Sequence, residues 1–398
     1  MWVPAIRPCF IPWPTRSAAR PRRTPEASMT LLHHLTGAPP GMTTRALMLR
    51  LAGIGAVLAG TAGVFTYAGG WLSPDALTPA RVVDRFEQVN GPHPGFRRNH
   101  AKGLCVAGTF ASNGAGARLS KASVFSAGRV TWVEGRVALA GGQPYAADAA
   151  ATVRSLALRF RLPEGEEWRT GMNNIPVFPV RTPEAFYEQL LAAKPDPATG
   201  KPDPERLKAF FAMHPESAKA AALIKARTIT AGFADSTFRS LNAFRFVASD
   251  GRTTPVRWAF LPERRPEPGS GAQEAQADKN VLFDTLAAEL RQEPLHWHLV
   301  VTLGQANDAT DDATLPWPSD RESVDVGTLT LTGAAPEDAD TCRVINFDPL
   351  VLPDGIAPSD DPLLSVRSAA YARSFTRRAG EEKVPSAVAG TSPDGASL

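Results

Sequence analysis

The sequence has few cysteines: three occur in 398 residues, Cys9, Cys105 and Cys342. A disulfide-rich framework and a zinc site both need cysteines at close, regular spacing, so this scatter argues against both classes of protein. A single Cys105–Cys342 bridge stays open. Two separate buried thiols are the favoured expectation, because an unpaired cysteine usually packs as a small hydrophobic side chain.

The sequence also lacks the positive charge of a nucleic-acid-binding protein. The formal net charge is +3, and residues 1–50 supply seven Arg and one acid, so the remainder is slightly acidic. No nucleic-acid-binding surface is therefore predicted. A Gly-x-Gly-x-x-Gly fingerprint on a strand-to-helix turn is missing too, which argues against a dinucleotide site.

The first 72 residues divide into two parts. Residues 1–41 are rich in Pro and Arg and are predicted to be a disordered or untranslated extension, with Met42 as the true start. Residues 42–72 place basic residues before the uncharged run 51–72, the pattern of a signal sequence or a single membrane anchor. Both alternatives predict a periplasmic or other extracytoplasmic protein, which contacts the membrane through residues 51–72 if they are not cleaved.

Downstream, hydrophobic periodicity predicts strands joined by hairpins, with helices inserted among them. Strands are expected in residues 104–162, most clearly Val153–Leu162, on both sides of the Asp250-Gly251 turn, and at 297–303, 328–332 and 342–347. Helices are expected at residues 78–90, 205–213, 215–227 and 281–291. The order predicts an antiparallel barrel with added helices.

Three short motifs follow one another along the chain. The first, residues 97–103, reads Arg-Arg-Asn-His-Ala-Lys-Gly and is similar to the Arg-x-x-His-Ala-Lys-Gly motif around the distal histidine of the haem catalases. The second is Asn-Asn-Ile-Pro-Val-Phe at residues 173–178, and the third, Arg367 to Tyr371, resembles the family's Arg-x-x-x-Tyr with its proximal iron ligand. In sequence motifs and their order, the chain resembles the haem catalase family and, within it, the small catalase-related peroxidases.

The resemblance implies an α+β fold: a catalase-like, eight-stranded antiparallel β-barrel with added helices, without the long N-terminal arm of typical catalases. The haem domain would span residues 73–378. Residues 379–398 are small and polar and are predicted to be a disordered tail. Because the missing arm helps to build the family's tetramer, a monomer or homodimer is expected.

The resemblance implies haem b (iron protoporphyrin IX) as the cofactor and Tyr371 as its iron ligand. Arg367 lies four residues earlier, so on a helix both side chains share one face, and the guanidinium would stabilise the phenolate. On the other side of the haem, His100 would move the proton of the bound peroxide from one oxygen to the other. Asn173 would hydrogen-bond the peroxide.

Further residues match family positions around the porphyrin. Phe178 and Phe186 match aromatic residues that pack on the ring. Three arginines fall where the family binds the haem propionates, which guanidinium groups pair with well: Arg97, Arg136 and Arg378.

Two departures from the family pattern affect the expected activity. Arg98 and Asn99 replace small apolar residues before His100 and predict a wetter, wider haem environment. Ala138 stands where the family has a serine that orients the essential imidazole, so His100 is expected to lose a partner. Both changes favour a peroxidase over an efficient catalase.

The predicted function is therefore a haem-dependent peroxidase that reduces organic hydroperoxides, and hydrogen peroxide as a further substrate, with an unidentified electron donor. Two alternatives remain. One is a small true catalase that disproportionates hydrogen peroxide, and the other is a membrane-tethered barrel that binds haem or an apolar ligand without turnover. A haem enzyme that rearranges fatty hydroperoxides would also suit this scaffold.

Overall fold

The computed structural model describes residues 43–69, 76–148, 152–266, 279–338 and 341–388, in two compact units, Met1–Ala76 and Leu77–Leu398. The described part of the first unit is the helix α2 (Thr44–Ala68), whose N-cap is Thr43. By length and composition, α2 could cross a membrane, although a signal sequence would pass the same test. The predictions for residues 1–41, and for the end of the apolar run at 70–72, lie outside the described residues.

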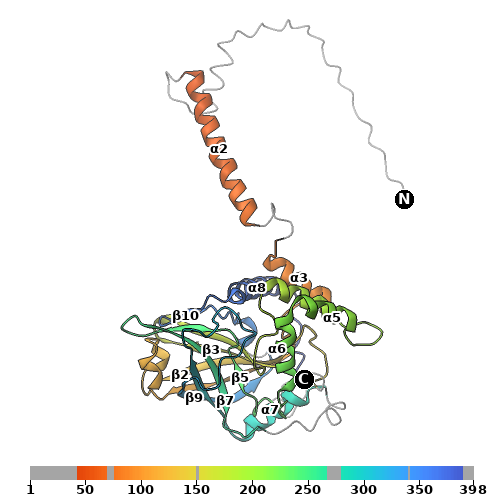
Figure 1. The fold of residues 1–398 in the computed structure, drawn as a ribbon, viewed down its shortest axis with the longest axis vertical. Coiled ribbons are helices and arrows are strands. Elements are labelled where there is room, and N and C mark those ends of the chain that lie inside the picture. Colours follow the sequence, from red (N-terminus) through yellow and green to blue (C-terminus); the bar gives the residue numbers. More distant parts are fainter. Residues whose placement is uncertain (1–42, 70–75, 149–151, 267–278, 339–340, 389–398) are drawn as a thin grey trace, which may run out of the picture. The chain divides into compact units, whose positions relative to one another are not determined.

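The second unit is built on a closed barrel (Figure 1). Within the described chain, eight antiparallel strands close it through the pairing of β7 with β8: β1 (Gly103–Ser112), β2 (Val130–Leu139), β3 (Arg154–Arg161), β4 (Glu167–Asn173), β5 (Phe238–Arg239), β7 (Thr253–Pro262), β8 (Leu295–Leu303) and β9 (Ser323–Ala335). Two further strands, β6 (Phe244–Val247) and β10 (Ile356–Pro358), extend the sheet beside β7. The predicted fold class is confirmed.

Helices cover the barrel and fill its connections: α3 (Pro79–Asn90), α4 (Pro183–Ala192), α5 (Pro204–Met213), α6 (Pro215–Ala226), α7 (Val281–Gln292) and α8 (Pro362–Ala379). Of these, α3 and α8 lie side by side (Figure 1). Short 3₁₀ turns complete the connections: η1 (Ala115–Arg118), η2 (Ser123–Phe125), η4 (Pro163–Gly165) and η5 (Thr341–Val344). The four predicted helices match α3, α5, α6 and α7 within two residues at each end.

The barrel interior is formed by alternating side chains. In β3, Leu156, Leu158 and Phe160 are fully buried, whereas the intervening positions face outward. Aromatic rings fill the centre, where Phe160 stacks on Trp168 with ring centroids 4.6 Å apart. Burial of each such side chain contributes about 1.5–3 kcal/mol, so the apolar alternation that predicted the strands is also what stabilises the barrel.

The segment between β9 and α8 differs from its prediction. Residues 342–347 form the turn η5 and an irregular stretch rather than a strand, and the carbonyls of Cys342 and Ile345 accept hydrogen bonds from Arg97. Cys342 is bonded to Cys105 at the start of β1, across 237 residues. The expectation of two separate thiols was therefore wrong, and the bridge left open by the sequence is present.

The beginning of the predicted tail also differs. Residues 380–388 pack on the domain: Glu381 accepts a hydrogen bond from the backbone N–H of Gly95 (2.8 Å), and Val388 is 1% exposed in the main core. The prediction of a disordered tail from residue 379 is wrong for this part, because a polar composition concealed specific ionic and apolar contacts. Residues 389–398 lie outside the described chain.

Candidate active site

The outer face of β1–β4 carries two rows of mostly small residues. Residues that face each other in paired strands project on the same side of a sheet. One row is Gly103, Ala138, Ser155 and Asn173; the other is Cys105, Arg136, Ala157 and Gly171. We call this surface the small-residue platform. It is a patch of sheet with mostly short side chains on the side away from the barrel core, and the Arg136 guanidinium and the Cys105–Cys342 disulfide cover part of it.

His100 lies just before β1, at the edge of this platform. Its backbone has φ 55°, a left-handed conformation that non-glycine residues rarely adopt. The Asn99 side-chain oxygen supports this turn by accepting hydrogen bonds from the N–H groups of His100 (3.0 Å) and Gly141 (2.9 Å). Asn99 therefore supports the backbone, and the prediction that it wets the haem environment is wrong.

Burial, together with the nearby positive charges of Arg136 and Arg367, lowers the pKa of His100 to about 3. At neutral pH the imidazole is consequently uncharged. A neutral imidazole can accept a proton, which is the state that the predicted role requires.

Ser155 connects His100 to Asn173. Its hydroxyl oxygen is 2.9 Å from His100 Nδ1 and also hydrogen-bonds Asn173 Oδ1. A hydroxyl has one hydrogen and the amide oxygen can only accept, so Ser155 donates to Asn173 and accepts from His100 Nδ1–H. Nε2 then keeps its lone pair, and the Asn173 NH₂ is left as a donor.

This arrangement corrects the expectation drawn from Ala138. Ala138 pairs directly with Ser155 across β2 and β3, so the hydroxyl is supplied from the next strand of the same row. His100 has not lost its partner. Comparison of motifs along the chain missed Ser155 because nothing in the sequence of β3 marks it.

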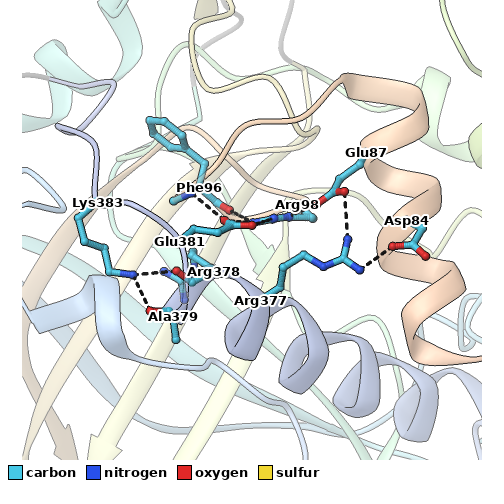
Figure 2. A network of polar contacts seen from close by, with 10 residues as sticks. Asp84, Glu87, Phe96, Arg98, Arg377, Arg378, Ala379, Glu381 and Lys383 are labelled. Atoms are coloured by element: carbon cyan, nitrogen blue, oxygen red, sulfur yellow. Dashed lines mark hydrogen bonds and ion pairs between the residues drawn. The ribbon is translucent and has the colours of Figure 1, made fainter. Parts of the chain in front are cut away.

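Arg98 also has a different place from the one predicted (Figure 2). It is 7% exposed and donates to Glu87 of α3 (2.7 Å) and to Glu381 (2.8 Å). Arg377 of α8 extends the network to Asp84 (2.6 Å) and to Glu87 (3.0 Å). Arg98 therefore ties the motif to α3 and to the C-terminal segment, and it does not wet the haem environment.

On α8, Arg367 and Tyr371 lie one turn apart, as predicted. Asp361 caps the helix, with its Oδ1 accepting from Leu363 N–H (2.9 Å). A Cβ added to Gly171 would lie 3.6 Å from both Tyr371 Oη and Arg367 Nη2, so both side chains reach the small-residue platform. The platform thus has His100, Ser155 and Asn173 at one edge and Tyr371 close to the adjacent row.

A chain of polar contacts continues from Arg367. Its guanidinium donates to Asn242 Oδ1 and to Gly171 O (3.3 Å), and Asn242 Nδ2 donates to Asp361 Oδ2 (2.7 Å). Asn242 is fully buried, 119 residues from Asp361 in the sequence. Sequence analysis missed Asn242 because it lies in the connection between β5 and β6, outside every motif.

The side chain of Glu337 lies among three arginines, Arg97, Arg136 and Arg378. Sequence analysis missed Glu337. We call these four residues the arginine cluster. Arg136 makes two 2.9 Å bonds to the Glu337 carboxylate, and Arg97 Nε is 3.8 Å from it. Burial and the other arginines hold the pKa of Arg97 well below its usual range, and burial lowers that of Arg378 to about 10. Burial tends to raise the pKa of Glu337, but Arg136, Arg97 and Arg378 together outweigh it, and the net shift is downward.

Phe178 and Phe186 pack against each other, with ring centroids 6.0 Å apart, in a small cluster with Val180 and Phe210. Tyr371 belongs to a different cluster, with Phe347. The structure therefore brings the two phenylalanines together but associates neither with the platform. Their predicted contact with a porphyrin stays a prediction.

These residues fit a haem. A planar group suits the small-residue platform, and the Tyr371 phenol on α8 could bind ferric iron as an anionic ligand, with the nearby Arg367 guanidinium stabilising the phenolate. Seven buried arginine Nε atoms in the described chain lack a hydrogen-bond partner, and two of them, Arg97 Nε and Arg378 Nε, belong to the arginine cluster, where they could donate to a carboxylate.

Comparison with known proteins agrees with the fold and with the motifs. A family model described as Catalase matches residues 73–386. The chain is 42% identical to a catalase-related peroxidase of Synechococcus elongatus, over 76% of this chain and 89% of the relative. It is 33% identical to a catalase-related peroxidase of Mycolicibacterium paratuberculosis, over 77% and 96% of the two chains.

Solved catalase structures share the fold at lower sequence identity. A fungal catalase superposes with a TM-score of 0.66 at 20% identity, over 75% of this chain and 62% of that one. A bacterial catalase gives 0.65 at 22% identity, over 77% and 62%. The chain thus spans about three fifths of these larger proteins.

Proposed function

The chain belongs to the catalase family and is a haem-dependent oxidoreductase that acts on peroxide; from this premise we propose that it is a peroxidase that reduces organic hydroperoxides with an external electron donor. The observation that carries the proposal is the small-residue platform. It brings the proton-transfer group His100 and the hydrogen-bond donor Asn173 onto the surface that Tyr371 also reaches, and two relatives with this family pattern are catalase-related peroxidases.

The cofactor in this proposal is haem b, which supplies the redox-active iron that activates the peroxide. Tyr371 would hold the iron as phenolate, and the positive charge of Arg367, which is hydrogen-bonded to Asn242, would stabilise that anion. Arginines of the arginine cluster pair with the haem propionates.

His100 Nε2 would accept a proton from one peroxide oxygen and donate it to the oxygen that leaves. Ser155 holds the imidazole in the tautomer that leaves Nε2 free. Asn173, whose Oδ1 is already bonded to Ser155, donates from its NH₂ to the peroxide and stabilises the charge that develops there.

A small true catalase is the second candidate, and the intact chain of His100, Ser155 and Asn173 favours it. Both departures that argued against catalase activity are absent from the site, since Arg98 and Asn99 are turned to other contacts and Ser155 supplies the hydroxyl. Oxygen evolution separates the candidates, because only disproportionation of hydrogen peroxide releases oxygen.

The test compares haem-loaded full-length protein with His100→Ala. Oxidation of a phenolic dye by cumene hydroperoxide should exceed oxygen evolution from hydrogen peroxide, and His100→Ala should lower dye oxidation by about 10²–10⁴-fold. Oxygen evolution as the faster reaction would instead favour the catalase. Bound haem with no turnover, unaffected by His100→Ala, would contradict both.

We also propose that the haem domain lies outside the cytoplasm, as a monomer or homodimer. Two features support the location: α2 is long and apolar enough to span a membrane, and a disulfide joins Cys105 to Cys342. Structural disulfides persist in oxidising compartments and are rare in the cytosol. A C-terminal alkaline phosphatase fusion should be active only if the domain is exported, and light scattering gives the oligomeric state.

A further inference from the structure

The chain after α8 returns to the loop that carries the distal histidine. Glu381 follows the end of α8, and its carboxylate accepts hydrogen bonds from Gly95 N–H (2.8 Å) and from the Arg98 guanidinium (2.8 Å). Figure 2 shows the pair formed by Arg98 and Glu381. Arg98 lies two residues before His100, and α8 carries Tyr371. The Arg98–Glu381 pair therefore joins the two segments that supply the distal and the proximal residue of the proposed site.

We call residues 381–388 the C-terminal strap. It forms no helix or strand, and Glu382, Lys383 and Pro385 are exposed. Lys383 Nζ donates to the carbonyls of the last two residues of α8 (2.7 and 3.2 Å), and Val388, 1% exposed, packs in the main core. A segment with so few buried contacts opens locally at a lower free energy than the barrel strands do.

The strap lies against the loop before His100 and next to the arginine cluster. Gly95 has φ 79°, and a Cβ added to it would lie 2.5 Å from Glu382 O, so the two backbones approach closely. Ser386 of the strap lines a small cavity together with three members of the arginine cluster. The strap is therefore one wall of the cavity beside which the carboxylates of the proposed haem would lie.

The two partners of the Arg98–Glu381 pair are held differently. Arg98 is 7% exposed and also donates to Glu87 of α3 (2.7 Å) and to Phe96 O (2.9 Å), so it keeps a counter-ion when the strap leaves. The Glu381 side chain is 22% exposed and lies on the strap itself, so opening transfers its carboxylate to water. Opening thus strands no buried charge, which is the usual large cost of breaking such a pair.

We propose that the C-terminal strap is a latch on the haem site: the Arg98–Glu381 pair holds it closed, and its local opening is the step through which haem enters and leaves. This inference rests on the proposed haem function. It also gives a role to Arg98, which stands where the family pattern has a small apolar residue. Because the strap is closed both before and after haem binds, weakening the latch raises the rates of binding and of loss together and leaves the affinity unchanged.

The test measures both rates on the full-length protein. Apo-protein is mixed with hemin to obtain the rate of binding, and the loaded protein is mixed with excess apomyoglobin, which captures released haem, to obtain the rate of loss. Glu381→Gln should raise both rates about 10-fold, the effect of losing a hydrogen bond to a charged group, at an unchanged ratio. A chain that ends after Gly380 should raise both rates further, whereas a chain that ends after Val388 should behave as the wild type.

Glu322→Gln is the matched control, since Glu322 pairs with Arg118 at a site where both side chains are 62% exposed, and it should leave both rates unchanged. Hydrogen exchange of the apo-protein is a second readout that needs no haem. In Glu381→Gln, the backbone N–H groups of the strap and of Gly95 should exchange faster, whereas those of β1 should exchange as in the wild type.

Faster loss of haem at an unchanged rate of binding would mean that Glu381 only stabilises the bound state, and this would overturn the inference. Unchanged rates, or unchanged hydrogen exchange of the strap, in Glu381→Gln would overturn it as well. These outcomes leave the proposed function intact, whereas failure of the wild type to bind hemin at all would refute the proposed function and the inference together.

Discussion

The distal group and the proximal group of the proposed site are built on different secondary structures. The distal group joins His100, in the turn before β1, to Ser155 and Asn173 of the neighbouring strands β3 and β4, and it is an uncharged hydrogen-bond chain. The proximal group, Tyr371 with Arg367, comes from one helix and continues as a charged chain into Asp361. In the distal group, the register between the strands sets the tautomer of His100. In the proximal group, the four-residue spacing on α8 places the positive charge of Arg367 beside Tyr371.

This difference predicts that the proximal group controls whether haem is retained and the distal group controls how fast peroxide reacts. The largest effect is expected from Tyr371→Phe, which removes the only atom of that side chain able to bind iron. The haem absorbance band should be lost or strongly shifted in the purified variant. Tyr145→Phe, at a residue 60% exposed, is the control and should leave the spectrum unchanged. An unaltered band in Tyr371→Phe would refute tyrosinate ligation.

Asn242→Leu tests the charged chain behind the ligand. The substitution breaks the link between Arg367 and Asp361 and leaves a buried carboxylate short of a donor, so the free energy of unfolding should fall by about 1–3 kcal/mol. Chemical denaturation measures this loss. Asn113→Leu, at an exposed asparagine, should cost much less. Equal losses in the two variants would mean that the chain does not stabilise the proximal helix.

Ser155→Ala tests the distal group with a smaller expected effect. Without the hydroxyl, His100 can adopt either tautomer, and the rate of peroxide consumption should fall about 10-fold at unchanged haem content. Ser155→Thr retains a hydroxyl and should recover most of the rate. A similar fall in both variants would point to packing rather than to the hydrogen bond.

The last prediction concerns pH. The native pKa of His100, about 3, lies below its unfolded value, so the folded protein binds fewer protons between these pH values. The stability contributed by the neutral imidazole is complete above about pH 6.5 and is lost as the pH falls towards 3, by up to about 1.4 kcal/mol per pH unit. Unfolding of the apo-protein should therefore depend more steeply on pH in the wild type than in His100→Gln. Parallel curves would contradict the assigned protonation state.

Sequence reasoning succeeded where function depends on spacing along one segment. Arg367 and Tyr371 share a helix face because they are four residues apart, and the His100 motif is continuous in the sequence. It failed where a partner is set by register between strands or by closure of the barrel. Ser155 reaches His100 across 55 residues, and Arg136 finds Glu337 across 201. Such pairs leave no local periodicity to detect.

The small-residue platform has a further consequence for which sequences this site tolerates. Any side chain larger than serine at Ala138, Ala157 or Gly171 would occupy the surface on which the planar cofactor is proposed to lie, although the barrel core behind it would be unaffected. In a saturation mutagenesis library sorted separately for folding and for haem content, variants with larger side chains at these positions should therefore fold but contain little haem. Variants that fold without haem would outline the area that the ring covers on the barrel.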